Sequence, residues 1–181
     1  MKRAIFWVIL TFILWVFPLY GETQRNPIDV NLIIDGSGAF SNVRGAATAW
    51  VLDRLDQVLL QGDRITVWNA GTRANIIFTG RIDSDSDRQA VNKAIRELTV
   101  SGTTPDFSGA LLEASQRQNA DFCYTLLISS SPAALSATLD GPQANLLRFS
   151  RVEEFSGWRA LVVGLNLDHR VRNAATAFIN Q

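Results

Sequence analysis

Short apolar runs alternate with amphipathic segments along most of the chain. The run at 28–34, Ile-Asp-Val-Asn-Leu-Ile-Ile, has the length and branched apolar content of a strand that becomes fully buried. Similar runs follow at 63–69, 74–79, 124–128 and 158–165. The short, turn-rich interval between the second and third runs predicts an antiparallel hairpin. We therefore expect five strands.

Most of the intervals between these strands contain apolar residues at helical spacing. After Ser41 or Asn42 as N-cap, apolar residues recur at helical spacing as far as Leu59, and Gly62 is placed to end the helix. Further helices are predicted to start at 84–87, at Phe107, at Pro132, at about Pro142 (with Leu146, Leu147, Phe149 and Val152 on its apolar side) and at about Asp168.

Strands separated by helices are typical of an α/β fold. We expect a doubly wound, mostly parallel sheet with one antiparallel edge strand and with helices on both faces. Residues 28–181 would form this single domain, and residues 22–27 a polar linker in front of it.

The first 21 residues differ from the rest of the chain. Lys2 and Arg3 precede a continuous apolar run rich in Trp and Phe, and no acidic residue occurs before Glu22. This pattern is typical of an export segment, either a cleaved signal peptide or an uncleaved membrane anchor. We expect a periplasmic or extracellular protein, attached to the membrane if the segment is retained.

Charge and cysteine content narrow the possible functions. The 17 basic and 17 acidic residues cancel and are interspersed, so no nucleic-acid-binding surface is indicated. Cys123 is the only cysteine, so the chain cannot form an internal disulfide. Its apolar neighbours indicate a small buried residue rather than a reactive thiol.

Polar clusters follow two of the predicted strands where each strand ends. Asp35 and Ser37 follow the first strand in Asn-Leu-Ile-Ile-Asp-Gly-Ser-Gly-Ala-Phe-Ser, and three serines, 129–131, follow the fourth. Thr103 and Thr104 lie in a loop that could reach the same edge. Ligands of open α/β sheets bind at the carboxyl ends of the strands, so we expect these residues to form one site.

The order of these motifs resembles that of a von Willebrand factor type A (VWA) domain over nearly all of the exported chain. Asp-Gly-Ser-Gly-Ala at 35–39 is similar to the Asp-x-Ser-x-Ser that ends the family's first strand. Gly-Asp-Arg-Ile-Thr-Val at 62–67 resembles its second strand, and Ser-Gly-Thr-Thr-Pro-Asp-Phe-Ser-Gly-Ala-Leu at 101–111 its threonine loop. The resemblance implies a protein-binding module, often completed by an acidic residue of the partner.

The resemblance also implies a metal-ion-dependent adhesion site, of which this chain keeps part. Ala39 stands where the family has a second Ser, and Ser130 where it has a second Asp; Ser41 and Asp106 are candidate substitutes. Mg²⁺ sites usually use one or two carboxylates, and a hydroxyl cannot replace the lost charge. We therefore expect no cofactor or a weakly bound Mg²⁺ at a degenerate site; the positions that correspond to the family's ligands are Asp35, Ser37, Thr103, Thr104 and Ser130.

Two enzymatic interpretations compete with this one. Gly-Ser-Gly-Ala-Phe-Ser at 36–41 approaches a dinucleotide fingerprint, but the third glycine is absent. A serine hydrolase could use Ser37 with the adjacent pair Asp168 and His169, although Gly-x-Ser-x-Gly is not present around Ser37. We favour an exported, non-catalytic module for protein recognition or adhesion, with the hydrolase as the alternative.

Overall fold

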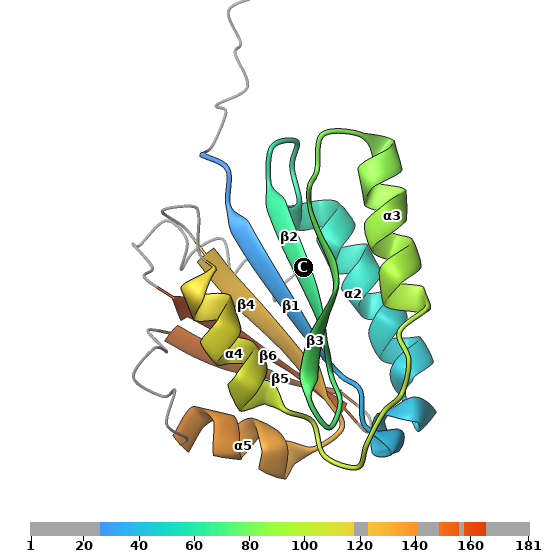
Figure 1. Ribbon diagram of the computed structural model, residues 1–181, viewed down its shortest axis with the longest axis vertical. Coiled ribbons are helices and arrows are strands. Elements are labelled where there is room, and N and C mark those ends of the chain that lie inside the picture. The colour runs from blue at the N-terminus through green and yellow to red at the C-terminus, as the bar shows by residue number, and fades with distance from the viewer. Residues whose placement is uncertain (1–25, 118–122, 141–148, 156–157, 166–181) are drawn as a thin grey trace, which may run out of the picture.

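The computed structural model describes residues 26–117, 123–140, 149–155 and 158–165 (Figure 1). The export segment, most of the linker, and the predicted last helix with Asp168 and His169 therefore lie outside the described residues. No helix within the described ranges is both long enough and apolar enough to cross a bilayer.

A six-stranded mixed sheet forms the centre of the domain, in the order β3-β2-β1-β4-β6-β5. β1 pairs in parallel with β2 and β4, while β3 is antiparallel to β2 and β6 is antiparallel to both β4 and β5. The strands are β1 (Asp29–Asp35), β2 (Arg64–Ala70), β3 (Ala74–Arg81), β4 (Cys123–Ser129), β5 (Phe149–Phe155) and β6 (Trp158–Leu165). The expected α/β fold class and the β2–β3 hairpin are confirmed.

The C-terminal part of the sheet differs from the expectation. A helix was predicted from about Pro142 through Val152, but residues 149–155 form β5, a strand paired with β6. The spacing of Leu146, Phe149 and Val152 fits a helix, and long-range pairing of the segment with β6 overrides this local pattern. β6 enters antiparallel between β4 and β5, so the sheet has two antiparallel strands instead of one.

Helices cover both faces of the sheet, as Figure 1 shows: α2 and α3 lie on one side, and α4 and α5 on the other. A short 3₁₀ helix, η1, leads from β1 into α2. The bounds are η1 (Gly38–Asn42), α2 (Arg44–Val58), α3 (Asp85–Arg96), α4 (Phe107–Gln116) and α5 (Pro132–Asp140).

The side chains of β1 point alternately to the two faces of the sheet, so they pack into two separate hydrophobic cores. On the α2 and α3 side, Leu32 and Ile34 pack with Phe40 of η1 and with apolar residues of both helices. On the other side, Ile33 packs with Trp68 and with the α4 residues Phe107 and Leu111. β1 is therefore buried throughout, as its apolar run predicted.

The helix starts were predicted with mixed success. Ser84 caps α3, because its hydroxyl accepts a hydrogen bond from Asp87 N. The Asp87 carboxylate accepts hydrogen bonds from the Ser84 hydroxyl and from Asp83 N. Both bonds lower the pKa of Asp87, and the bond from Ser84 has the larger effect. By contrast, neither Ser41 nor Asn42 caps α2, which is preceded by Val43 without a side-chain cap. The intervening 3₁₀ turn moves the start of α2 beyond both residues.

The turn from α2 into β2 explains the Gly-Asp-Arg sequence. α2 ends at Val58, so Gly62 does not end it; Gly62 instead has φ +96° in the following turn. Asp63 is buried, and its two carboxylate oxygens accept hydrogen bonds from Ile28 N (3.0 Å) and Leu60 N (2.7 Å). Asp63 therefore holds the end of the α2 segment against the start of β1.

Candidate functional site

Asp35 is the last residue of β1 and lies at the carboxyl end of the parallel strands. Its side chain is fully buried. One carboxylate oxygen, Oδ1, accepts a hydrogen bond from the backbone of Ser37 (2.8 Å). This local bond turns the chain sharply out of the strand and into η1.

The other oxygen of Asp35 joins β1 to the end of β4. Oδ2 accepts hydrogen bonds from the hydroxyl of Ser129 (2.7 Å) and from the backbone of Ser130 (3.4 Å). The Ser129 hydroxyl in turn accepts from Ser131 N (2.9 Å). Both oxygens of this buried carboxylate are therefore engaged: Oδ1 in the local turn after β1, and Oδ2 in joining the ends of β1 and β4.

Backbone hydrogen bonds bring the threonine loop to the same edge of the sheet. Ser101 N donates to Gly36 O (2.6 Å), and Gly38 N donates to Gly102 O (3.0 Å). Gly36 N also donates to Ala70 O at the end of β2 (2.9 Å). The ends of β1, β2 and β4 and the loop at 101–106 thus meet around Asp35, as the polar clusters predicted.

Two glycines allow these loops to approach one another. A Cβ on Gly36 would overlap Oδ1 of Asn69 and lie 3.0 Å from Gly71 N, and a Cβ on Gly71 would lie 2.6 Å from Ser101 O. Any larger residue would force the loops apart.

Asp106 does not act as a substitute ligand in this arrangement. Its carboxylate caps α4 by accepting from Gly109 N (2.9 Å), and it also accepts from Ala74 N (3.3 Å) at the start of β3. Ser41 is likewise engaged, since its hydroxyl donates to Gly38 O (2.6 Å). Both residues stabilise local turns.

The predicted site residues lie on segments that meet at this sheet edge, and they differ in exposure. Ser37 is buried, whereas Thr103 and Thr104 are exposed and Ser130 is partly buried. The Ser130 hydroxyl oxygen is itself buried and has no hydrogen-bond partner in the described part of the chain. Two threonines of the site are therefore exposed, whereas the Asp35 carboxylate is buried.

This donor set suits a divalent cation poorly. Mg²⁺ prefers near-octahedral oxygen ligands with one or two carboxylates. Here the single carboxylate already accepts three hydrogen bonds, all of which a bound ion would compete with. Among the described residues, no group of three or more acidic, histidine or cysteine side chains is placed to hold a metal ion.

Two residues of the site were not among the predicted ligands. Ser129 was noted only as part of a serine cluster, and Asn69 was not considered. Asn69 is buried at the end of β2, where its amide nitrogen donates to Thr99 O (2.8 Å). This hydrogen bond connects β2 to the segment before the threonine loop. The signal for both is a polar residue at the last positions of an apolar strand.

The hydrolase alternative stays a prediction, because Asp168 and His169 lie outside the described residues. A reactive thiol, on the other hand, is contradicted. Cys123 is buried, and this burial, together with the nearby Asp29 carboxylate, raises the pKa of the thiol to about 12 despite a hydrogen bond from Asn31. A thiol with so high a pKa is a poor nucleophile at neutral pH.

Comparison with known proteins gives distant matches. No protein-family model matches the chain. A protein of Treponema pallidum (strain Nichols), described as an uncharacterized protein, is 24% identical; the match covers 97% of this chain and 84% of that protein.

Several solved structures are similar to part of the fold, and VWA domains are among them. A von Willebrand factor type A protein from Catenulispora acidiphila is 23% identical with a TM-score of 0.43, covering 50% of this chain and 22% of the other. The vWF domain of a type V pili tip protein from Porphyromonas gingivalis is 21% identical with a TM-score of 0.47, covering 55% of this chain and 36% of the other. A pilus adhesin from Lactobacillus rhamnosus GG is 20% identical with a TM-score of 0.42, covering 51% and 13%. This chain thus spans well under half of each of these solved chains.

Proposed function

We propose that this chain is an exported, non-catalytic protein-binding module that uses the loops around Asp35 and does not depend on a metal ion. We call this surface the rim; it consists of Gly38, Thr103, Thr104 and Ser130, of which Ser130 is partly buried. The observation that carries the proposal is the buried Asp35 carboxylate, whose oxygens accept hydrogen bonds from Ser37, Ser129 and Ser130.

The internal hydrogen bonds of Asp35 weaken the metal-dependent alternative. A cation would have to replace these bonds and bring its own water ligands into a site that offers one negative charge. The attraction between one carboxylate and a cation near a partly wet surface is on the order of several kcal/mol before desolvation. The removal of three buried hydrogen bonds to a charged group costs a comparable amount, because each contributes about 1.5–3 kcal/mol.

The chemistry of the rim fits an acidic or hydroxyl-bearing group of a partner protein. Thr103 and Thr104 are exposed, whereas the Ser130 hydroxyl oxygen is buried, so the threonines are the accessible hydroxyl donors. Hydroxyl donors on a loop that backbone hydrogen bonds fix in place lose little entropy on binding. A partner carboxylate could accept from them directly.

The export part of the proposal rests on the sequence. The basic start and the apolar run before residue 21 would direct the chain out of the cytoplasm, either free or attached to the membrane. The partner is then expected at the cell envelope or outside the cell.

Crosslinking in intact cells tests the proposal. A photoreactive amino acid would replace Thr103 in the full chain, and a matched chain would carry it at Asp56, an exposed residue of α2. We expect a protein adduct from position 103 but not from position 56, with equal yield when a chelator is present. Adducts that disappear with chelator would show that binding depends on a metal ion. Equal adducts from both positions would exclude the rim as the binding surface.

A further inference from the structure

Arg73 is an exposed residue in the turn that joins β2 to β3. This turn follows the carboxyl end of β2, so it lies at the same edge of the sheet as the rim. Most described basic side chains are paired, as Arg81 is with Asp83 (2.9 Å). Within the described part of the chain, by contrast, the Arg73 side chain makes no ion pair and no hydrogen bond.

The β2–β3 turn is packed directly against the threonine loop at 101–106. Asp106 N donates to Gly71 O (3.0 Å), which joins the two segments through their backbones. Gly102 has φ +87° and lies so close to the turn that an added Cβ would be 2.9 Å from Thr72 N. The exposed residues of the turn and of the threonine loop therefore belong to one surface.

Arg73 is the only exposed charged residue of this edge of the sheet within the described segments that form it. These segments are residues 35–44, 70–73, 99–106 and 129–133. Arg44 is half-buried and donates to Leu98 O (3.0 Å).

The two acidic residues of the same edge face internal donors. Asp35 is fully buried, and both of its oxygens accept hydrogen bonds. Asp106 is half-buried, and its oxygens accept from Gly109 N (2.9 Å) and Ala74 N (3.3 Å). Its charge is also offset by the N-terminal end of α4. A partner therefore meets the positive charge of Arg73 first.

We propose that Arg73 is a specificity-determining residue of this surface and that it selects a carboxylate group of the partner. This inference rests on the function proposed for the rim. The planar guanidinium can donate two parallel hydrogen bonds to one carboxylate. The hydroxyls of Thr103 and Thr104, which form no hydrogen bond with other described residues, would supply further donors.

Charge separates this partner chemistry from the alternatives. A neutral amide or hydroxyl of the partner would accept a hydrogen bond from Arg73 without the attraction between opposite charges. A lysine or arginine of the partner would be repelled. Because an exposed ion pair is screened by salt and costs side-chain entropy, Arg73 sets the preference among partners and does not supply most of the affinity.

Retention on immobilised peptide libraries tests this assignment. The short peptides vary at their flanking positions and carry a fixed central Asp, Asn or Lys. At low salt we expect the purified full chain to be retained by the Asp library at least about fivefold more than by the Asn library, and least by the Lys library. Salt at about 0.5 M should reduce this difference. Equal retention on the Asp and Asn libraries, or no retention on any of them, would overturn the proposal.

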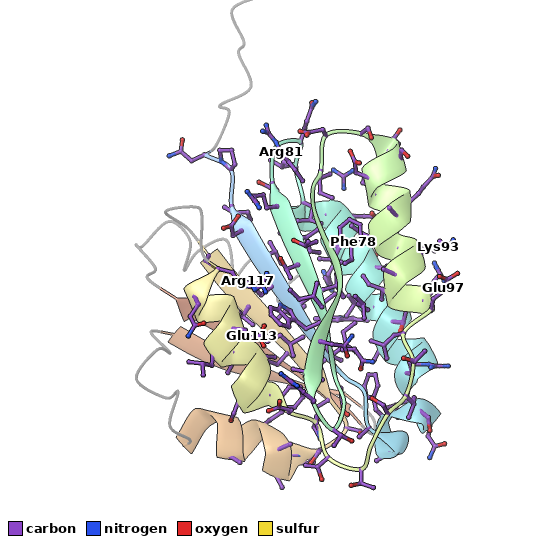
Figure 2. The ribbon with its side chains drawn as sticks, in the orientation of Figure 1. Phe78, Arg81, Lys93, Glu97, Glu113 and Arg117 are labelled. Atoms are coloured by element: carbon purple, nitrogen blue, oxygen red, sulfur yellow. The ribbon has the colours of Figure 1, made fainter. Side chains whose placement is uncertain are left out.

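Substitutions at the two ends of β3 separate local charge from net charge. Arg73→Glu should abolish the preference for Asp, and Arg73→Gln should bring the Asp and Asn libraries close to equality. Arg81→Glu makes the same change in net charge roughly 27 Å away, at the end of β3 where Figure 2 labels Arg81, and should leave the preference unchanged. Both positions are exposed, so the variants are expected to fold. A preference that survives Arg73→Glu, or that Arg81→Glu reduces as much, would show that Arg73 does not select the partner.

The crosslinking experiment separates failure of this inference from failure of the proposed function. Adducts from position 103 that persist unchanged in Arg73→Glu would leave the rim as the binding surface and exclude Arg73 as its specificity-determining residue. A lack of adducts from position 103 in the chain that keeps Arg73 would overturn the proposed function, and this inference with it.

Discussion

The hydroxyl of Ser129 donates a hydrogen bond of 2.7 Å to the carboxylate of Asp35, 94 residues earlier in the chain. Both residues are buried, and both end parallel strands that are paired with each other. This bond, with those from Ser37 and Ser130, makes Asp35 the residue that joins the turn after β1 to the end of β4.

Removal of this carboxylate should destabilise the whole domain. Asp35→Ala would leave one buried hydroxyl and two backbone amides without their acceptor, so we expect the free energy of unfolding to fall by about 3 kcal/mol or more. Ser129→Ala removes one donor to Asp35 and the acceptor of Ser131 N, and should cost about 1–3 kcal/mol. Urea denaturation of the two variants and of the natural chain measures this. Equal stability of Asp35→Ala and the natural chain would show that the carboxylate does not hold the loops together.

Placing at positions 39 and 130 the ligand types that the VWA resemblance implies should strengthen metal binding. We expect the natural chain to bind Mg²⁺ and Mn²⁺ weakly in calorimetry. The double variant Ala39→Ser and Ser130→Asp adds a hydroxyl and a second carboxylate near Asp35, and should bind both ions at least about tenfold more tightly. Ser86→Asp, which adds a carboxylate on exposed α3, controls for net charge. Tight binding by the natural chain would contradict the proposed metal independence.

Local sequence patterns predicted the parts of the fold that depend on local chemistry. The strand at 28–34 is β1 (Asp29–Asp35), because a continuous branched apolar run suits a strand buried on both faces. Ser84 caps α3 because a hydroxyl before a helix accepts from its first amides. β5 was predicted as a helix because its apolar residues are three positions apart, as in a helix. The pairing with β6 that makes this segment a strand depends on residues outside it.

The candidate site was predictable in its location but not in its internal bonding. Apolar runs that end in Asp35 and in the serines after 128 indicate that polar groups meet at one sheet edge. Which serine contacts Asp35 depends on the register of β1 against β4, where Ile34 lies opposite Ile128. The sequence contains no local signal for that register, so Ser130 was expected to take the place of a metal ligand and the role of Ser129 was not foreseen.

The close approach of the loops predicts that glycine substitutions will have opposite effects at different positions. Gly71→Ala would place a Cβ 2.6 Å from the Ser101 carbonyl oxygen, which is backbone and cannot rotate away, so we expect a loss of about 1–3 kcal/mol in stability. Gly45→Ala is the matched control, because nothing lies within 4 Å of its added Cβ in α2. Alanine there should stabilise the domain by up to about 1 kcal/mol through its higher helix propensity. Thermal and urea unfolding measure both changes, and similar effects of the two substitutions would contradict the packing of the loops.

The buried thiol predicts a loss of stability at alkaline pH. Burial raises the pKa of Cys123 from its ordinary 9.0 to about 12, so the folded chain keeps this proton where the unfolded chain releases it. The contribution of the thiol is therefore fully present below about pH 9 and is lost as the pH rises toward 12. The free energy of unfolding of the natural chain should fall faster over this interval than that of Cys123→Ala, since other groups titrate alike in both chains.

Thiol labelling gives an independent measurement of the same burial. At neutral pH, Ellman's reagent should react with Cys123 slowly in the folded chain and rapidly in urea, because the folded thiol is protonated and inaccessible. Labelling of the folded chain should then report the opening of the sheet around β4. Rapid labelling without denaturant, together with parallel pH profiles for the natural chain and Cys123→Ala, would show that the thiol is accessible and that its pKa is close to the ordinary value.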